Sequence, residues 1–144
     1  MNDRANQLYQ QILLETARSP HHFYEMETAD HQLEAYNPYC GDQYQIYLDI
    51  EDGRIREGSF SGYGCAVSKA STSALVQRLE GLSRSEALAL LAEFRKAMQG
   101  GSPDSEELFQ ALSVAKQFPG RESCASLSWD ALEQWLTSID SLPG

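Results

Sequence analysis

Residues 43–81 have the sequence QYQIYLDIEDGRIREGSFSGYGCAVSKASTSALVQRLEG, which carries the clearest signals for strands, a turn and a helix. Residues 43–48 alternate polar and apolar side chains, as a strand with one buried face does. Residues 51–53, Glu-Asp-Gly, are a tight-turn sequence that leads into a second arm over residues 54–60. Apolar residues then recur at helical spacing over residues 67–79. The stretch therefore predicts a β-hairpin followed by a helix.

Helices are predicted on both sides of this stretch. Apolar positions within residues 1–19 have helical spacing, and Pro20 ends the pattern. Ser83 and Glu86 have the spacing of a capping box in front of another helix. The segment from Pro20 to Tyr39 has no sustained period, so we expect an extended loop or an arm laid over the core.

The C-terminal part carries signals for two more helices. Ser102-Pro103 places an N-cap residue before a proline in the first turn of a helix that runs toward Phe118-Pro119-Gly120. A last helix is predicted from Leu127 to Ile139, with Cys124 near its start. The prediction is a single α+β domain over residues 1–144, with a small antiparallel sheet packed against several helices.

Composition narrows the classes of function. The chain has 11 basic and 21 acidic residues, a formal net charge of -10, which disfavours nucleic acid and anionic membrane surfaces as partners. It has no apolar run near the length of a membrane span and no apolar signal segment at its N-terminus, so we expect a cytoplasmic protein. Its 3 cysteines are an odd number, which favours free thiols or metal ligands over a disulfide framework.

Cys40-Gly41-Asp42 places a thiolate and a carboxylate two residues apart, with a flexible glycine between them. This spacing suits a shared metal ion, although ordinary turn chemistry explains the triplet equally well. Cys65 and Cys124 each follow a turn and open a predicted helix, where free backbone N–H groups favour a thiolate. Each cysteine taken alone is also compatible with a small buried apolar residue.

The candidate ligands Cys40, Asp42, Cys65 and Cys124 make a complete tetrahedral set for zinc, and thiolates also anchor iron–sulfur clusters. Their combined negative charge exceeds that of a divalent cation, so a nearby cation is expected. Arg121 is the stronger candidate, and Lys69 is better explained as a solvated surface charge. For the histidines His21, His22 and His31, surface or packing roles are favoured over metal ligation.

Three ordered motifs match a known family: NPYCGD at 37–42, GYGCAVSKAS at 62–71, and RESCA at 121–125 with LSW at 127–129. Together they resemble the IscU/NifU N-terminal family, and more closely its SufU branch. The resemblance implies the same α+β fold, and it marks residues 81–119 as the helical insertion of SufU-like members. Ser123 stands where IscU-type scaffolds carry a histidine, which favours the SufU branch.

The resemblance implies a role in iron–sulfur cluster assembly, with Cys40, Asp42, Cys65 and Cys124 as ligands of zinc or of a transient iron–sulfur cluster. It implies that Cys40 accepts persulfide sulfur from a SufS-like cysteine desulfurase, and that the charge of Arg121 assists. A protein that works in this way would be a zinc-dependent sulfurtransferase. Apo iron–sulfur proteins or other assembly proteins would take the sulfur or cluster downstream.

Two alternatives stay open at this stage. In the first, the same ligands build a cluster that is then transferred, which makes the protein a scaffold. In the second, zinc is purely structural and the domain is an adaptor. The sequence alone does not choose between zinc and iron, because both metals accept this ligand set.

Overall fold

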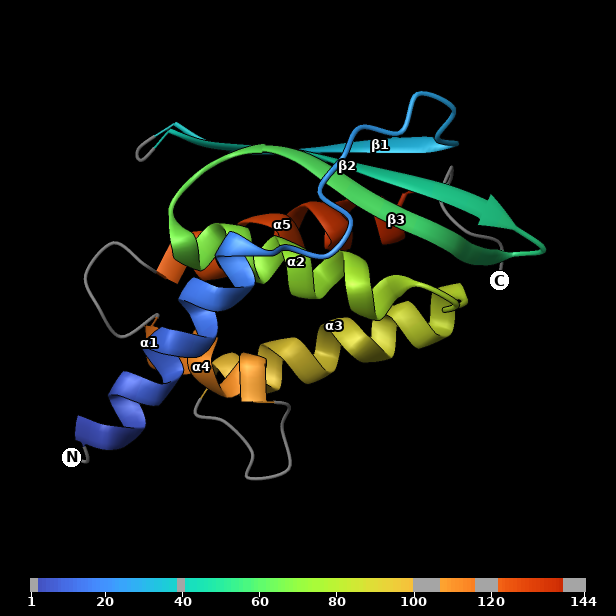
Figure 1. The fold of residues 1–144 in the computed structure, drawn as a ribbon. Helices are drawn as coiled ribbons and strands as arrows, with labels where there is room; N and C mark the ends of the chain where they lie inside the picture. Colours follow the sequence, from blue (N-terminus) through green and yellow to red (C-terminus); the bar gives the residue numbers. More distant parts are fainter. Residues whose placement is uncertain (1–2, 39–40, 100–106, 116–121, 139–144) are drawn as a thin grey trace.

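The computed structural model describes residues 3–38, 41–99, 107–115 and 122–138, and its order of helices and strands agrees with the predicted α+β class (Figure 1). The elements are α1 (Asp3–Arg18), β1 (His31–Asn37), β2 (Asp42–Glu51), β3 (Arg54–Tyr63), α2 (Ala66–Leu79), α3 (Arg84–Met98), α4 (Glu107–Ala115) and α5 (Glu122–Leu136). The sheet forms one layer, α2 and α5 lie beneath it, and α1, α3 and α4 lie farther from it (Figure 1).

The sheet is three-stranded and antiparallel, in the order β1-β2-β3. The predicted hairpin is β2 and β3, which pair with Ile46 opposite Phe60. Its turn places Asp52 at φ 53° and Gly53 at φ 74°. Positive φ at both central residues is the geometry of the two-residue turns that match the twist of a hairpin.

Strand β1 corrects the expectation of an extended loop or arm from Pro20 to Tyr39. Residues His31–Asn37 form a regular strand in which Leu33 and Ala35 are buried between exposed neighbours. The alternation is short and the segment has few apolar residues, so the sequence alone does not identify it as a strand. Pairing with β2 makes it a regular edge strand of the sheet.

The arm is confirmed for the part that precedes β1. The N–H of Phe60 donates to the carbonyl of His22, and Phe23 forms a bridge with Phe60, so this segment lies along the outer edge of β3. The ammonium of Lys69 lies 4.4 Å from the centre of the Phe23 ring, which ties α2 to the same segment. The arm thus covers an edge that would otherwise expose unpaired backbone groups.

The predicted helices are present, but α5 begins at Glu122, five residues before the predicted Leu127, so Cys124 lies within its first turn. The N-terminal helix ends at Arg18, before Pro20. The predicted capping box at α3 is present, because Ser83 accepts from the N–H of Glu86 and Glu86 accepts from the N–H of Ser83. Residues 84–98 and 107–115 of the expected insertion are helical, whereas Ser102-Pro103 and residues 118–120 lie outside the described residues.

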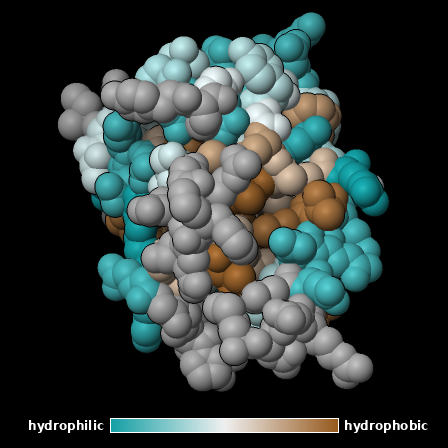
Figure 2. Space-filling view, turned by 90° about the vertical axis from the view of Figure 1, so that its left-hand side faces the viewer, coloured by the Kyte–Doolittle hydropathy of each residue, from teal (hydrophilic) through white to brown (hydrophobic). Residues whose placement is uncertain are grey.

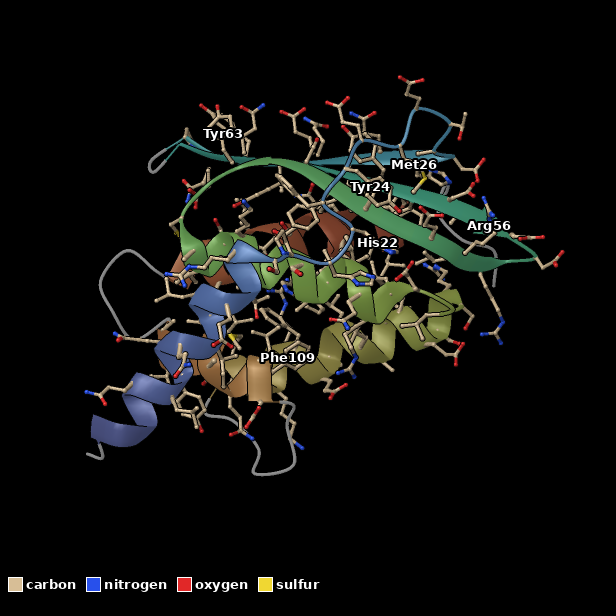
Figure 3. All side chains as sticks on the ribbon, in the orientation of Figure 1. His22, Tyr24, Met26, Arg56, Tyr63 and Phe109 are labelled. Atoms are coloured by element: carbon tan, nitrogen blue, oxygen red, sulfur yellow. The ribbon has the colours of Figure 1, made fainter. Side chains whose placement is uncertain are left out.

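The core is centred on Trp129 of α5, which is fully buried. Its ring stacks on Phe94 of α3 with centroids 4.1 Å apart, and it meets Phe109 of α4, which Figure 3 labels, edge to face at 5.5 Å. Its indole N–H donates to Ser71 of α2 at 3.0 Å. The residue therefore joins four helices at one point and fixes the direction of α5. Among the described helices, none combines the length and the apolar character needed to cross a membrane.

Candidate metal centre

Strand β2 delivers Asp42 to the inner face of the sheet. The alternation that buries Tyr44 and Ile46 extends back by one step to Asp42, which is 3% exposed. Asp42 pairs with Asn37, the last residue of β1, so this carboxylate lies at the end of the sheet near the start of α2 (Figure 1). A buried carboxylate at this place needs partners, and α2 and α5 provide them.

Helix α2 brings Cys65 to the carboxylate. Cys65 is the N-cap residue of the helix, as expected, and no cap hydrogen bond comes from its own side chain. Its N–H donates to Asp42 Oδ1 at 3.2 Å, and its Sγ lies 3.9 Å from Asp42 Oδ2. The same sulfur lies 3.7 Å from Ser68 Oγ in the first turn of α2. The Asp42 carboxylate therefore caps the helix and contacts the thiol at once.

Helix α5 supplies the third donor, Cys124, in its first turn. This cysteine is 1% exposed, whereas Cys65 is half-buried. Ser123 beside it accepts a hydrogen bond from Asn37 Nδ2 at 3.1 Å, which links the start of α5 to the end of β1. Asp42, Cys65 and Cys124 each offer one ligand atom, and these three atoms all lie within 4.8 Å of one another.

A negative charge on a thiol of this cluster is unfavourable unless a cation compensates it. Burial raises the pKa of the Cys124 thiol, and its hydrogen bonds with Asp42 and Cys65 raise it further. Burial also raises the pKa of Tyr44, whose hydroxyl lies 2.9 Å from Ser68 Oγ beside the cluster. A divalent cation would reverse this balance, since it stabilises thiolates and carboxylate together.

Gly64 has no side chain, and atoms of the cluster occupy the space that a side chain there would fill. A Cβ on Gly64 would lie 2.5 Å from Tyr44 Oη, 2.5 Å from Ser68 Oγ and 2.9 Å from Asp42 Oδ1. None of these atoms could stay in place beside a side chain at residue 64. The glycine before Cys65 thus allows the end of β3 to pass close to the donor groups.

Three of the four predicted ligands lie among the described residues. The structure brings together Asp42, Cys65 and Cys124, and two thiols with a carboxylate are donor types that zinc and iron both accept. Cys40 and Arg121 lie outside the described residues, so their expected roles stay predictions. Lys69, considered as a compensating cation, lies against the ring of Phe23. The face that carries this end of the sheet displays hydrophobic side chains among hydrophilic ones (Figure 2).

A second cluster was not predicted. The rings of His21 and His22, expected to have surface or packing roles, stack with centroids 3.8 Å apart and both contact Glu80. Adjacent residues usually point apart, but here His22 has a φ of 50° and both rings contact Glu80. The HH pair was the available sequence signal, but nothing in the sequence connects it to Glu80.

The model of the NifU-like N-terminal domain matches residues 8–136. The chain belongs to this family. It is 32% identical over 134 residues to the iron–sulfur cluster assembly scaffold protein IscU of Streptococcus pyogenes serotype M1, covering 91% of this chain and 84% of that protein. It is 31% identical over 136 residues to the zinc-dependent sulfurtransferase SufU of Bacillus subtilis strain 168, covering 92% of each chain.

Solved structures agree with the family. A structure described as an iron–sulfur cluster assembly scaffold protein for the SUF system, from Fervidobacterium islandicum AW-1, superposes with a TM-score of 0.79 at 27% identity. The match covers 92% of this chain and 98% of that one. The expected IscU/SufU-like fold is therefore confirmed.

Proposed function

We propose that this protein serves iron–sulfur cluster assembly as a zinc-dependent sulfur acceptor for a cysteine desulfurase. The observation that carries the proposal is the convergence of Asp42, Cys65 and Cys124 from three separate segments within 4.8 Å. Family membership and the similarity to both IscU and SufU proteins support it. A cytoplasmic location would follow from this role.

Cys40 is the fourth ligand in this proposal. It is two residues before Asp42 in the sequence, and the thiol would complete a set of three sulfurs and one oxygen. Zinc, when bound, would hold the thiols in their deprotonated form at neutral pH. A carboxylate is a harder ligand than a thiolate and binds a soft metal more weakly, so the set is easier to open than one of four cysteines.

The transfer step uses the Cys40 thiolate as the nucleophile. It attacks the outer sulfur of the persulfide on the desulfurase, so that a new S–S bond forms on Cys40. The S–S bond of the desulfurase breaks, and its cysteine leaves as a thiolate. Arg121, three residues before Cys124, would offset the negative charge of the ligands and of the incoming persulfide.

The test uses the protein with a SufS-like desulfurase and L-cysteine. With a dithiol added to reduce the persulfide, wild-type protein should accelerate sulfide release; without the dithiol, the peptide containing Cys40 should gain the mass of one sulfur atom. Cys40→Ala should abolish both effects while the far-UV circular dichroism stays unchanged. Glu34→Gln, on the exposed face of β1, is the control that should behave as wild type. Full stimulation by Cys40→Ala would reject the relay.

A scaffold on which a cluster is built is the second candidate, favoured by the named function of the streptococcal relative. Anaerobic reconstitution with iron and sulfide should then give a stable charge-transfer spectrum that requires Cys65 and Cys124. If the protein instead retains zinc under these conditions, and no cluster spectrum develops, the acceptor role stands. Apo iron–sulfur proteins would be the final recipients in either case.

A further inference from the structure

We propose that His21, His22 and Glu80 form a second site, which binds a divalent cation of the zinc class. Each residue offers one ligand atom, and these three atoms all lie within 4.8 Å of one another. Two imidazoles and a carboxylate are a donor set that zinc accepts, with a water able to take any open position. The site is separate from the cysteine cluster and goes beyond the proposed sulfur transfer.

The distances already approach those of a coordination shell. Glu80 presents a different oxygen to each ring: Oε1 lies 2.7 Å from His21 Nε2, and Oε2 lies 3.3 Å from His22 Nδ1. In a tetrahedral site with bonds of about 2.0–2.1 Å, neighbouring ligand atoms lie roughly 3.3 Å apart. Each ring nitrogen lies at this spacing, or within about 0.6 Å of it, from its own Glu80 oxygen, so a tetrahedral site needs the carboxylate to turn until one oxygen serves both rings.

The backbone that carries the rings is held by regular structure. The N–H of His21 donates to Ser73 of α2 at 2.8 Å, and the carbonyl of His22 accepts from the N–H of Phe60 in β3 at 3.1 Å. The left-handed conformation of His22 is unfavourable for a residue with a Cβ, and the contacts on both sides maintain it. Donor groups held in this way lose little freedom when an ion binds.

The site is open to solution but partly shielded from it. The side chains of His21, His22 and Glu80 are 30%, 34% and 24% exposed, respectively. Figure 3 shows His22 and Tyr24 on the segment that passes in front of α2 and β3. The Tyr24 ring lies 5.4 Å from the His22 ring, centroid to centroid, and its hydroxyl donates to Glu57.

Binding costs hydrogen bonds that the structure identifies, and the first is the one between His21 Nε2 and Glu80 Oε1 at 2.7 Å. His22 Nδ1 also lies 2.9 Å from the carbonyl oxygen of Gly58, which accepts its proton when Nδ1 carries one. Ligation through Nδ1 requires the ring proton to be on Nε2, so this hydrogen bond is given up. The site should therefore bind zinc more weakly than a set rich in thiolates. A bound ion would join the arm directly to the end of α2.

The two sites are far enough apart to be tested separately. Cys65 precedes α2 and Glu80 follows it, and the 14 residues of this helix span about 20 Å at a rise of 1.5 Å per residue. Zinc chloride would be added to ¹⁵N-labelled protein already supplied with one equivalent, and the histidine ring resonances recorded. The resonances of His21 and His22 should shift at the second equivalent, and those of His31, which packs against Trp135, should not.

Variants then measure the affinity by calorimetry. Glu80→Gln and His21→Gln should weaken the second binding event at least tenfold, whereas His31→Gln and Glu34→Gln should leave it unchanged. A wild-type spectrum in which His21 and His22 do not respond to zinc overturns the site, and so does undiminished binding by Glu80→Gln. The spectrum of the wild-type protein decides even if a variant fails to fold. No desulfurase enters the experiment, so its outcome is independent of the sulfur relay.

Discussion

The carboxylate of Asp42 contacts Cys65 through both of its oxygens. Oδ1 accepts the backbone N–H of Cys65 at 3.2 Å, and Oδ2 lies 3.9 Å from the Cys65 sulfur. One side chain from the first residue of β2 thus fixes the start of α2 and provides a donor to the same cluster. Its role in the fold and its role as a ligand can be separated, because only the second requires a negative charge.

Asp42→Asn and Asp42→Ala should separate these roles. An amide oxygen can still accept the N–H of Cys65, so the free energy of unfolding of Asp42→Asn should stay within about 1 kcal/mol of the wild-type value. Asp42→Ala has no such acceptor, and its free energy of unfolding should be lower by about 1–3 kcal/mol. Both variants should bind zinc at least tenfold more weakly. Urea unfolding and competition with a chromophoric chelator measure the two quantities. Wild-type zinc affinity in Asp42→Asn would show that the carboxylate is no ligand.

Gly64→Ala should disrupt the cluster without changing any donor. The new Cβ would lie within 3 Å of atoms of Tyr44, Ser68 and Asp42, so these side chains must move. We expect zinc affinity to fall by tenfold or more, with a loss of about 1–3 kcal/mol in stability. Gly58→Ala is the matched control, because its Cβ meets atoms no closer than 3.5 Å. Equal zinc affinities in the two variants would contradict this account of Gly64.

Zinc affinity should rise with pH. Burial raises the pKa of Cys124, so the thiol is protonated at neutral pH in the metal-free protein and must lose its proton to bind zinc. Each proton released makes the apparent affinity up to tenfold stronger per pH unit, and titrations between pH 6.5 and 8 would measure the slope. A flat profile would mean that Cys124 is already ionised or does not bind.

The raised pKa of Cys124 also makes the stability of the metal-free fold depend on pH in the alkaline range. The folded-state pKa of Cys124 is raised above that of the unfolded chain, so the folded protein binds more protons in the interval between the two values. The contribution of this group to stability is present below the ordinary thiol pKa of about 8.5 and is lost as pH rises above it. Cys124→Ala should remove this part of the alkaline loss.

Chelation should leave the fold intact. The core around Trp129, Phe94 and Phe109 is built from helices α3, α4 and α5 and needs no metal to pack. Far-UV circular dichroism should therefore change little after treatment with a chelator, although the melting temperature should fall because a ligand of the folded state is lost. Unfolding on chelation would instead favour a structural zinc adaptor.

The sequence alone was sufficient for features that depend on neighbours along the chain. The alternation through Tyr44 and Ile46 defined a strand, the Asp52-Gly53 turn defined its hairpin, and Ser83 with Glu86 defined the start of α3. Periodicity, turn dihedrals and caps are set within a few residues, so they can be recognised without a fold. The motifs around Cys65 and Cys124 also led to the correct family.

Contacts between residues far apart in the sequence depend on the packing of the helices and strands. Strand β1 became regular through pairing with β2, and three donors from separate segments met because Asp42 faces inward where α2 and α5 begin. His21 reached Glu80 across 59 residues of sequence through packing of the arm on α2 and β3. Such contacts depend on the direction of whole elements, which is set by burial of the core and not by the local order of residues.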